Sequence, residues 1–286
     1  MNNTVNTSTK NRLLDHGAEK KLCSLCGLCM ASAWPAEESI AGCVFTTGWL
    51  GKQEANLFGQ ERSRNDYDEM LFGISRERFV ARITNPLPNV QFSGIITSMA
   101  KKAFDAGLVD AVITVHRSTE DYMLPEPVLA RSTEAILAGA GSKPVLAPSL
   151  ISLEKAYTEG IKRLLVIGTS CQVQNLREFK RRFPYFKKLN LYVIGIPCTD
   201  NCYPKKFRWV LEQMSRSPQT VRFIEFMQDF TIHLKHDNGH LEQIPFFCLP
   251  EQLARGEIHP PSCRSCFDYM NSLADITVGY LGAPLN

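Results

Sequence analysis

The residues best suited to chemistry in this chain are its ten cysteines, several of which stand close together in the sequence. Cys23, Cys26 and Cys29 are each separated by two residues, and Cys43 follows at a longer interval. Three thiolates at this spacing can wrap one face of an iron–sulfur cubane, and a more distant fourth completes the ligand set. We therefore predict an iron–sulfur site here. A structural zinc, which prefers two separated pairs of ligands, is the weaker alternative.

A second group combines the pair Cys263 and Cys266 with two isolated cysteines. The pair alone is half a zinc site or a redox dithiol, and an isolated cysteine is often just a buried apolar side chain. However, Cys171 and Cys198 each follow a predicted strand of one parallel sheet. Ligands bind at that edge of open α/β sheets, so we expect these two cysteines to meet there and to join the pair.

The composition bounds the class of protein. Hydrophobic residues make up 44% and charged residues 21% of the 286, as in soluble globular proteins. The polar start, residues 1–21, lacks the apolar stretch of a secretory signal and is predicted to be a flexible leader of a cytoplasmic, non-transmembrane protein. Thiols stay reduced in that compartment, which favours metal ligands over disulfides. A formal net charge of +3 does not indicate nucleic-acid binding.

We predict an α/β fold in which a cysteine-rich segment, residues 22–90, precedes an α/β domain, residues 91–286, with parallel βαβ units and a β-hairpin. Ser93 is a plausible cap of the first helix, and Gly107 its stop. The other expected elements are a strand at 111–115, a helix at 133–138, a helix from 149 to 160, a strand at 164–167, a loop at 168–171, a helix at 172–183, a strand at 191–196, a helix opened by Pro204, a strand at 223–226, a hairpin of 231–235 and 241–244, and a strand at 274–278.

Two further features are left with alternatives. Cys202 and Cys248 have no partner at ligand spacing. We predict that Cys248 packs against apolar neighbours, whereas Cys202 is left undecided, with packing preferred. A run of basic residues in and just after the predicted helix at 172–183 is either a solvated face or a docking surface for an acidic electron carrier. The run comprises Arg177, Lys180, Arg181, Arg182, Lys187 and Lys188.

Several stretches together resemble a known family. They are CSLCGLC at 23–29, QFSGIITSMA at 91–100, STEDYMLPEPVLARSTEAIL at 118–137, KPVLAPSL at 143–150, KRLLVIGTSCQVQ at 162–174, IPCTDN at 196–201, EFMQDFTIHLKHDNGHLEQIPFF at 225–247 and SCRSCFDYMNSLADITVGYLGAP at 262–284. The chain resembles the coenzyme F(420) hydrogenase/dehydrogenase beta-subunit family. Within it, the chain is most similar to the branch of 7-hydroxymethyl chlorophyll a reductase and ferredoxin-dependent divinyl chlorophyllide 8-vinyl reductase.

The resemblance implies FAD and two [4Fe-4S] clusters. It implies Cys23, Cys26, Cys29 and Cys43 as ligands of one cluster, and Cys171, Cys198, Cys263 and Cys266 as ligands of the other. The flavin-binding residues that it implies are Gln91, Ser93, Gly94, Lys143, Ser149 and Asn201. It also implies that family members continue past the Gly-Ala-Pro stretch, so we expect their C-terminal part to be absent here. It names no catalytic residue.

The function that this resemblance implies is a relay of electrons from a ferredoxin-like donor, through the clusters and FAD, to an organic substrate. The substrate expected first is a chlorophyll-type tetrapyrrole, reduced at a vinyl or hydroxymethyl group. Alternatives are a reductase or dehydrogenase of the deazaflavin coenzyme F(420), an electron-transfer subunit of a larger complex, and a zinc-stabilised binding module. Whether the chain forms a homo-oligomer stays open.

Overall fold

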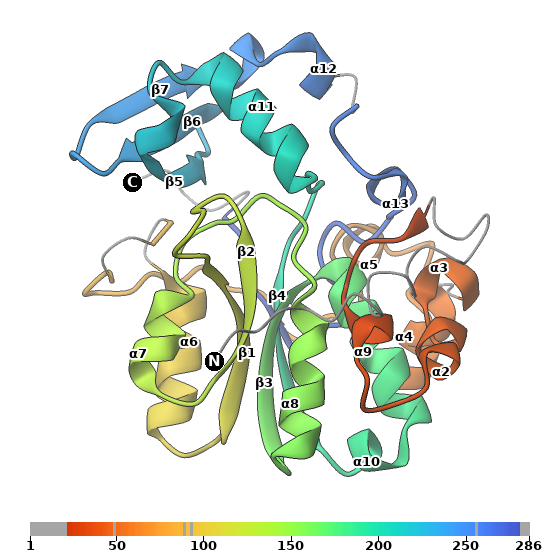
Figure 1. Ribbon diagram of the computed structural model, residues 1–286. Coiled ribbons are helices and arrows are strands. Elements are labelled where there is room, and N and C mark those ends of the chain that lie inside the picture. The colour runs from red at the N-terminus through yellow and green to blue at the C-terminus, as the bar shows by residue number, and fades with distance from the viewer. Residues whose placement is uncertain (1–21, 48–49, 88–89, 92–93, 255–256, 281–286) are drawn as a thin grey trace.

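The structure is a computed structural model that describes residues 22–47, 50–87, 90–91, 94–254 and 257–280 (Figure 1). It contains a five-stranded sheet of order β2-β1-β3-β4-β8 and a three-stranded antiparallel sheet of order β5-β6-β7. In the first sheet β1, β3, β4 and β8 are parallel and β2 is antiparallel to β1. The strands are β1 (Ala111–Arg117), β2 (Pro125–Ala130), β3 (Arg163–Thr169), β4 (Asn190–Ile196), β5 (Val221–Phe226), β6 (Thr231–His236), β7 (Leu241–Pro245) and β8 (Ile276–Thr277). The predicted α/β class, with its parallel units and hairpin, is confirmed.

Helices cover both faces of the five-stranded sheet (Figure 1). Alternate residues of β1 point to opposite faces: Ile113 packs with the helices α8 and α9, whereas Val112 packs with α6 and α7. The helices of this region are α6 (Ile95–Asp105), α7 (Thr133–Ala138), η3 (Ser149–Ile151), α8 (Ser152–Thr158), α9 (Ser170–Arg182), α10 (Pro184–Lys187) and α11 (Pro204–Met214). Both faces of the parallel strands are thereby buried, as parallel sheets require.

The start of α9 differs from the prediction. We expected residues 168–171 to form a loop, but α9 begins at Ser170, so Cys171 lies in its first turn. Thr169 and Gln172 form a capping box, in which the N–H of Thr169 donates to Oε1 of Gln172 at 3.0 Å. This cap starts the helix directly after β3. Cys171 therefore sits on a regular element.

Two strands at the sheet edges also differ. β2 was not predicted, because Pro125 and Pro127 break the usual strand pattern, yet prolines are tolerated in an edge strand. The last strand is only Ile276–Thr277, shorter than the expected 274–278. Beside its start, the N–H of Asp275 donates to the carbonyl of Val193 at 3.1 Å, and the N–H of Val193 donates to the Asp275 carboxylate at 2.8 Å.

The cysteine-rich segment is more ordered than its weak periodicity suggests. It forms η2 (Leu28–Met30), α2 (Ala36–Ala41), α3 (Val44–Thr47), α4 (Leu50–Phe58) and α5 (Tyr67–Phe72). Leu28, Ala31 and Trp34 lie in the same apolar core as α8 and α9. The cysteine loop is thus packed against the sheet domain. The boundary at residue 90 stays a prediction.

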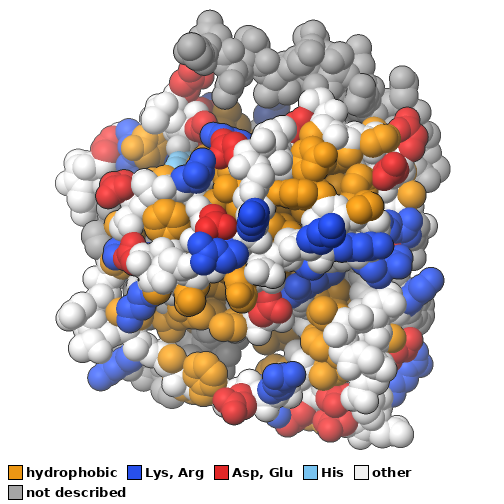
Figure 2. All heavy atoms as spheres, turned by 90° about the horizontal axis from the view of Figure 1, so that it is seen from below, with side chains coloured by type: hydrophobic (Ala, Val, Ile, Leu, Met, Phe, Trp, Pro, Cys, Tyr) orange, Lys and Arg blue, Asp and Glu red, His pale blue; other side chains and the backbone are white. Residues whose placement is uncertain are grey.

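The three-stranded sheet packs against α11, with Phe207, Val210 and Ile232 in their shared core. Four short elements complete the described chain: η4 (Pro218–Thr220), η5 (Phe246–Cys248), α12 (Glu251–Ala254) and α13 (Pro261–Arg264). Seen from below, Lys and Arg side chains form a band across the face at which the parallel strands begin (Figure 2). None of the helices in the described ranges is long and apolar enough to cross a membrane.

Candidate functional site

The first cysteine loop is held in a tight shape against the sheet domain. Gly27 has φ 101°, and a Cβ added there would lie 2.5 Å from the carbonyl oxygen of Pro148. The N–H of Leu25 donates to Sγ of Cys23 at 3.3 Å. Backbone N–H groups directed at cysteine sulfurs stabilise thiolates, which are the form that binds metal.

Cys43 approaches this loop from the turn between α2 and α3. The turn is fixed to α9, because the N–H of Val44 donates to Oδ1 of Asn175 at 2.8 Å. Burial first, then the charges of Cys43 and Cys29, raises the pKa of Cys26. Burial, with Cys23 and Cys43, raises the pKa of Cys29 to about 11. The four cysteines of this group therefore lie within electrostatic range of one another.

The second group lines a cavity at the carboxyl ends of β3 and β4. Its wall carries Cys171 from α9, Cys198 from the loop after β4, and Cys263 and Cys266 from and beside α13. Two cysteines after neighbouring strands and a pair near the C-terminus thus share one wall, as the parallel topology predicts. The hydroxyl of Ser170, also in this wall, is buried and has no hydrogen-bond partner among the described atoms.

The loop that follows Cys266 is tied to both strands by one side chain. Nδ2 of Asn271 donates to the carbonyl of Gly168 at 2.8 Å and to that of Ile196 at 3.2 Å. Gly195 is needed beside it, since an added Cβ would lie 2.7 Å from Cγ of Asn271. The carboxyl ends of β3 and β4 and the cysteine pair are thereby held in one arrangement.

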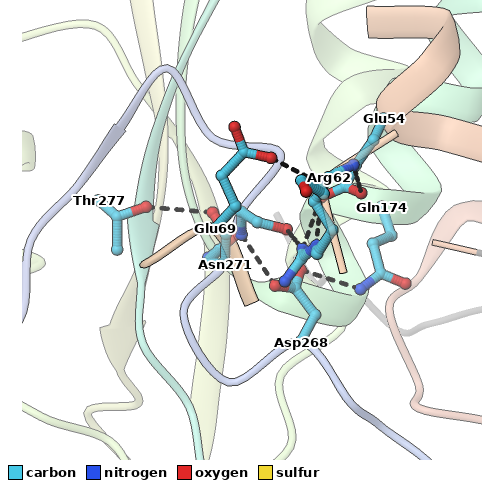
Figure 3. Close-up of polar contacts among 9 residues, drawn as sticks. Glu54, Arg62, Glu69, Gln174, Asp268, Asn271 and Thr277 are labelled. Carbon is cyan, nitrogen blue, oxygen red and sulfur yellow. Dashed lines mark hydrogen bonds and ion pairs between the residues drawn. The ribbon is translucent and has the colours of Figure 1, made fainter. Parts of the chain in front are cut away.

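A buried polar network extends this support to the N-terminal helices (Figure 3). Asp268 accepts Nε2 of Gln174 on α9 at 3.0 Å, and it also accepts the N–H of Ser272 at 2.9 Å. Nη2 of Arg62 donates to Oγ of Ser272 at 2.9 Å and forms an ion pair with the buried carboxylate of Glu54. The network joins α4, α9 and the loop after Cys266, so both cysteine groups rest on one support.

The thiols around the cavity are hard to ionise unless a cation joins them. Burial, followed by repulsion from Cys171 and Cys263, raises the pKa of Cys198. Burial also raises the pKa of Cys263, to about 11, and that of Cys266. Four thiolates become stable together only beside positive metal, and thiolates are the ligands of iron–sulfur clusters. In the described part of the chain, no three His, Cys, Asp or Glu side chains gather to hold a single metal ion. The cysteines instead line the wall of a cavity.

The two cysteine groups adjoin. Ser24, between two cysteines of the first loop, lines the second cavity and hydrogen-bonds to Cys171. Cys26 and Cys171 are close enough for each charge to influence the other group. Ser262, in α13, donates to the carbonyl of Cys23 at 3.2 Å. Electrons passed between the two groups would cross a short, packed contact.

The residues predicted to bind flavin fall in two places. Nε2 of Gln91 donates to the carbonyl of Phe226 at 2.6 Å, and its Oε1 accepts the hydroxyl of Ser142, which precedes Lys143. Gly94, with φ 73°, caps α6 close to this point, and an added Cβ would lie 2.8 Å from Val90. Ser93 lies outside the described residues.

The other two predicted flavin residues lie nearer the cysteines. Asn201 lines the cysteine cavity, where its carbonyl accepts Nδ1 of His259 at 3.1 Å. Ser149 is fully buried beside the first loop, and its hydroxyl has no hydrogen-bond partner among the described atoms. The structure does not bring Ser149 to Lys143. The stretch from Lys143 to Ala147 does connect the two places, since Leu146 and Ala147 also line the cysteine cavity.

Sequence reasoning missed several residues of the site and misplaced one spare cysteine. Asp268 and Asn271 hold the loop after Cys266 in place, but neither was singled out from the sequence. Cys202 is buried in the core of the second sheet, in agreement with the preferred of its two alternatives. Cys248 is exposed, so its expected packing role is wrong; it lies in η5, at the surface end of the hairpin.

Comparisons with known proteins agree with this architecture. Residues 78–154 match "Coenzyme F420 hydrogenase/dehydrogenase, beta subunit N-term" and residues 161–286 match the corresponding C terminus. The chain is 43% identical to uncharacterized protein all1601 of Nostoc sp., over 93% of this chain and 65% of that protein. It is 40% identical to the chloroplastic 7-hydroxymethyl chlorophyll a reductase of Oryza sativa, over 93% of this chain and 55% of that protein.

A solved structure extends the comparison to three dimensions. A chain of the F420-reducing [NiFe] hydrogenase complex from Methanosarcina barkeri superposes with a TM-score of 0.60 at 25% identity, covering 68% of this chain and 66% of that one. The present chain thus spans a little more than half to two thirds of these relatives' lengths. Both family matches, the shared fold and the cysteine pattern lead to one conclusion: the chain belongs to the coenzyme F420 hydrogenase/dehydrogenase beta-subunit family.

Proposed function

We propose that this chain is an iron–sulfur flavoprotein oxidoreductase. In this proposal a ferredoxin-like donor supplies single electrons, which pass through two [4Fe-4S] clusters and FAD to an organic substrate. The observation that carries it is the placement of eight cysteines in two adjoining groups, one in the loop before α2 and one around the cavity. A chlorophyll-type tetrapyrrole is the first choice of substrate, supported by the identity with 7-hydroxymethyl chlorophyll a reductase.

The chain's own groups suit both clusters. Cys23, Cys26, Cys29 and Cys43 would hold one, and Cys171, Cys198, Cys263 and Cys266 the other. Such clusters accept and release one electron at potentials set by hydrogen bonds, burial and charge. The N–H of Leu25 on Cys23 and the hydroxyl of Thr169, 3.7 Å from Sγ of Cys171, are groups of this chain that would tune them.

Binding of FAD is assigned to the region of Gln91, Gly94 and Lys143. When bound, a flavin exchanges single electrons on one side and an electron pair on the other. Gln91 accepts a hydrogen bond from Ser142 and donates one to the carbonyl of Phe226 in β5. These two contacts join this region to the second sheet. The stretch from Lys143 to Ala147 runs from this region to the wall of the cysteine cavity. This supports the proposed passage of electrons between the flavin and the clusters.

Cofactor analysis of protein purified without oxygen tests the proposal. We expect about eight irons and one FAD per chain, the content of two cysteine-held cubanes and one flavin. Cys263→Ser should lower the iron content to about four, because it removes one ligand from one cluster only. Cys248→Ser is the matched control: it alters an exposed cysteine outside both groups and should leave the iron content unchanged.

The result that would refute the relay is equally specific. A colourless wild-type protein with zinc in place of iron would favour the binding-module alternative. Iron content that falls equally in Cys263→Ser and Cys248→Ser would contradict the assignment of the second group. About four irons and no flavin in the wild type would reduce the chain to an electron-transfer subunit.

A second candidate function has its own support. The chain is 25% identical to coenzyme F420 hydrogenase subunit beta of Methanothermobacter thermautotrophicus, over 76% of this chain and 74% of that protein. This favours a deazaflavin coenzyme as the electron-pair partner. Reduced holoprotein mixed with the deazaflavin, or with a hydroxymethyl or vinyl tetrapyrrole, decides between them, since only the true partner should reoxidise it within seconds.

A further inference from the structure

A second pocket lies in the seam between the two sheets. Arg117 at the carboxyl end of β1, Lys143 from the loop before the cysteine cavity, and Arg222 of β5 all line it. Tyr122 and Ser142 add hydroxyl groups to the wall. No Asp or Glu is among its described lining residues. A concave site lined by three cations, of which only Arg222 pairs with a carboxylate, that of Asp237, favours an anion.

Two of these cations have no acidic partner in the described structure. Arg117 donates to the carbonyls of Ala140, at 3.2 Å, and Ser142, at 2.5 Å. Nζ of Lys143 donates to the carbonyls of Gly139, Ala140 and Gly141, at 2.6 to 3.3 Å. By contrast, Arg163, Arg177 and Arg181 elsewhere in the fold each pair with a carboxylate. Carbonyl oxygens solvate the two cations without neutralising them.

Burial makes the charged forms of both Lys143 and Arg117 less stable, and a bound anion would offset this cost. Burial, with help from Arg117, lowers the pKa of Lys143 to about 7. Burial likewise lowers the pKa of Arg117 to about 10. Both cations are disfavoured in the folded chain, so a negative group between them would gain more than it would beside solvated lysines.

The backbone and the aromatic rings shape the third cation for the same task. β5 has an irregularity in its register between Val221 and Phe223, which is where Arg222 lies. Irregularities of this kind redirect side chains at functional edges. The guanidinium of Arg222 stacks 4.7 Å from the ring centre of Tyr122, and that of Arg117 lies 4.7 Å from the ring centre of Phe223. Arg222 also forms an ion pair with Asp237 at 2.8 Å, so a bound phosphate would share this guanidinium with that carboxylate.

The pocket also connects with the rest of the site. Ser142 hydrogen-bonds to Gln91, and Val145 of the pocket wall is followed by Leu146 and Ala147 of the cysteine cavity. The two pockets therefore lie along one stretch of chain, and a phosphorylated ligand held in this pocket would have the cysteine cavity as its neighbour.

We propose that Arg117, Lys143 and Arg222 form a binding site for the phosphate-ester oxygens of such a ligand. The phosphate belongs either to a flavin dinucleotide or to a separate phosphorylated substrate. The first source rests on the proposed function, because it requires that the chain bind FAD. Arg117 and Arg222, which come from two different sheets, and Lys143 would each donate hydrogen bonds to the phosphate oxygens.

Titration of the purified holoprotein, stripped of flavin, with inorganic pyrophosphate, FAD and riboflavin tests the site. Arg117→Gln and Lys143→Met should each weaken pyrophosphate binding about tenfold or more, since each removes a charged hydrogen-bond donor. Arg131→Gln is the control, because Arg131 is an exposed arginine paired with Glu159 outside the pocket. Riboflavin, which has no phosphate, should bind all four proteins alike.

The two sources give different results. If FAD binding weakens together with pyrophosphate binding, the flavin supplies the phosphate. If pyrophosphate binding weakens but FAD affinity is unchanged, the site takes a separate phosphorylated ligand. Arg117→Lys, which keeps a cation, should recover part of the affinity and excludes misfolding as the cause.

The site is disproved if wild-type protein binds no pyrophosphate, or if both variants bind it as the wild type does. Iron content measured on the same samples separates this failure from failure of the relay. Loaded clusters with unaltered phosphate binding in the variants would remove the site and leave the relay in place. Iron-free protein with variant-sensitive pyrophosphate binding would do the reverse.

Discussion

The N–H of Leu150 donates a hydrogen bond of 2.9 Å to the carbonyl oxygen of Cys26. Leu150 lies in η3, fully buried in the core beneath the five-stranded sheet. The bond joins a cysteine of the N-terminal loop to the sheet domain, across more than a hundred residues of sequence. The loop therefore has a fixed position relative to Cys171 and the second cavity, which makes the geometry between the two groups a property of the core.

Gly27 is the residue on which this approach depends. Gly27→Ala places a Cβ 2.5 Å from the Pro148 carbonyl at a φ of 101°, so the loop must move away from η3. We expect a loss of stability of about 1–3 kcal/mol from the strained backbone and the displaced contact. We also expect the iron content to fall by about half, because the displaced loop would no longer hold the ligands of the first cluster in place. Thermal unfolding and iron analysis measure both effects.

Gly107 provides the matched control. It also has a positive φ, 64°, but an added Cβ meets nothing within 4 Å. Gly107→Ala should therefore show only the backbone cost, about 1 kcal/mol, with full iron content. Equal iron loss in both variants would mean that the close packing on Pro148 is not what shapes the first cysteine loop.

The sequence is informative wherever chemistry depends on local spacing or on strand order. The triple Cys23, Cys26 and Cys29 could be interpreted directly, because a loop of three thiols folds on itself. The meeting of Cys171 with Cys198 followed from parallel topology, since each comes after the end of a neighbouring strand. The hairpin turn at Gly239, with φ 82°, was likewise encoded by two adjacent residues.

What the sequence hides are contacts between elements that fold far apart. Arg117 is an ordinary strand-end residue until β5 brings Phe223 beneath its guanidinium. Asn271, which has φ 58°, can link β3 and β4 only because its loop reaches the ends of both strands in the folded chain. Cys248 looks like a core residue because apolar neighbours precede it, yet Phe247 beside it is 87% exposed. The apolar composition of a segment alone does not determine whether that segment is buried.

The ion pair of Glu54 with Arg62 is expected to be essential for the support of the second cavity. Glu54 is fully buried, and Nε of Arg62 donates to it at 2.8 Å. Arg62→Met would leave a buried carboxylate without its partner and free Ser272, at a cost of about 3–5 kcal/mol. Urea unfolding measures the change. The double variant Glu54→Gln with Arg62→Met should recover part of it, because the buried charge is gone.

Arg78→Met is the comparison for that pair. Arg78 also pairs with a carboxylate, Asp68, but both side chains are about half exposed. Exposed pairs contribute little, so we expect no measurable change in unfolding. If Arg62→Met is as mild as Arg78→Met, the network in Figure 3 does not stabilise the loop that carries Cys266.

We expect the proposed electron donor to dock at the basic C-terminal end of α9. A Cβ added at Gly42, next to Cys43, would lie 3.5 Å from the side chain of Arg182, so this end of the helix adjoins the first cysteine group. Arg181 beside it is 50% exposed, and the band of cations in Figure 2 continues the positive surface. Arg181→Gln should slow reduction by an acidic ferredoxin several-fold at low salt and less at high salt.

Two controls isolate the encounter from the chemistry. Reduction of Arg181→Gln by dithionite, a small reductant that needs no docking surface, should match the wild type. Arg216→Gln, an exposed arginine next to the second sheet, should leave the ferredoxin rate unchanged. A uniform effect of both variants would show a dependence on net charge, and no effect of either would place the donor on another face.

Lys143 gives the protein a pH dependence whose sign is determined by burial. Its pKa falls to about 7 in the folded chain, whereas an unfolded lysine has a pKa of about 10.4. Between these values the folded chain binds fewer protons than the unfolded chain, so stability rises with pH across that window. The charged groups that face Lys143 are Arg117 and Arg222, and Tyr122 is the other titratable one.

Lys143→Met removes the buried cation and should therefore stabilise the phosphate-free protein most below about pH 7, with the difference shrinking towards pH 10. Lys102→Met, which changes an exposed lysine of α6, should show a difference that does not vary with pH. Unfolding free energies measured from pH 6 to 10 test this. Pyrophosphate should shrink or reverse this difference below about pH 7, because it binds the charged wild-type pocket more tightly than the variant. A pH-independent difference for Lys143→Met would mean that Lys143 keeps its proton throughout and that its carbonyl contacts alone satisfy the charge.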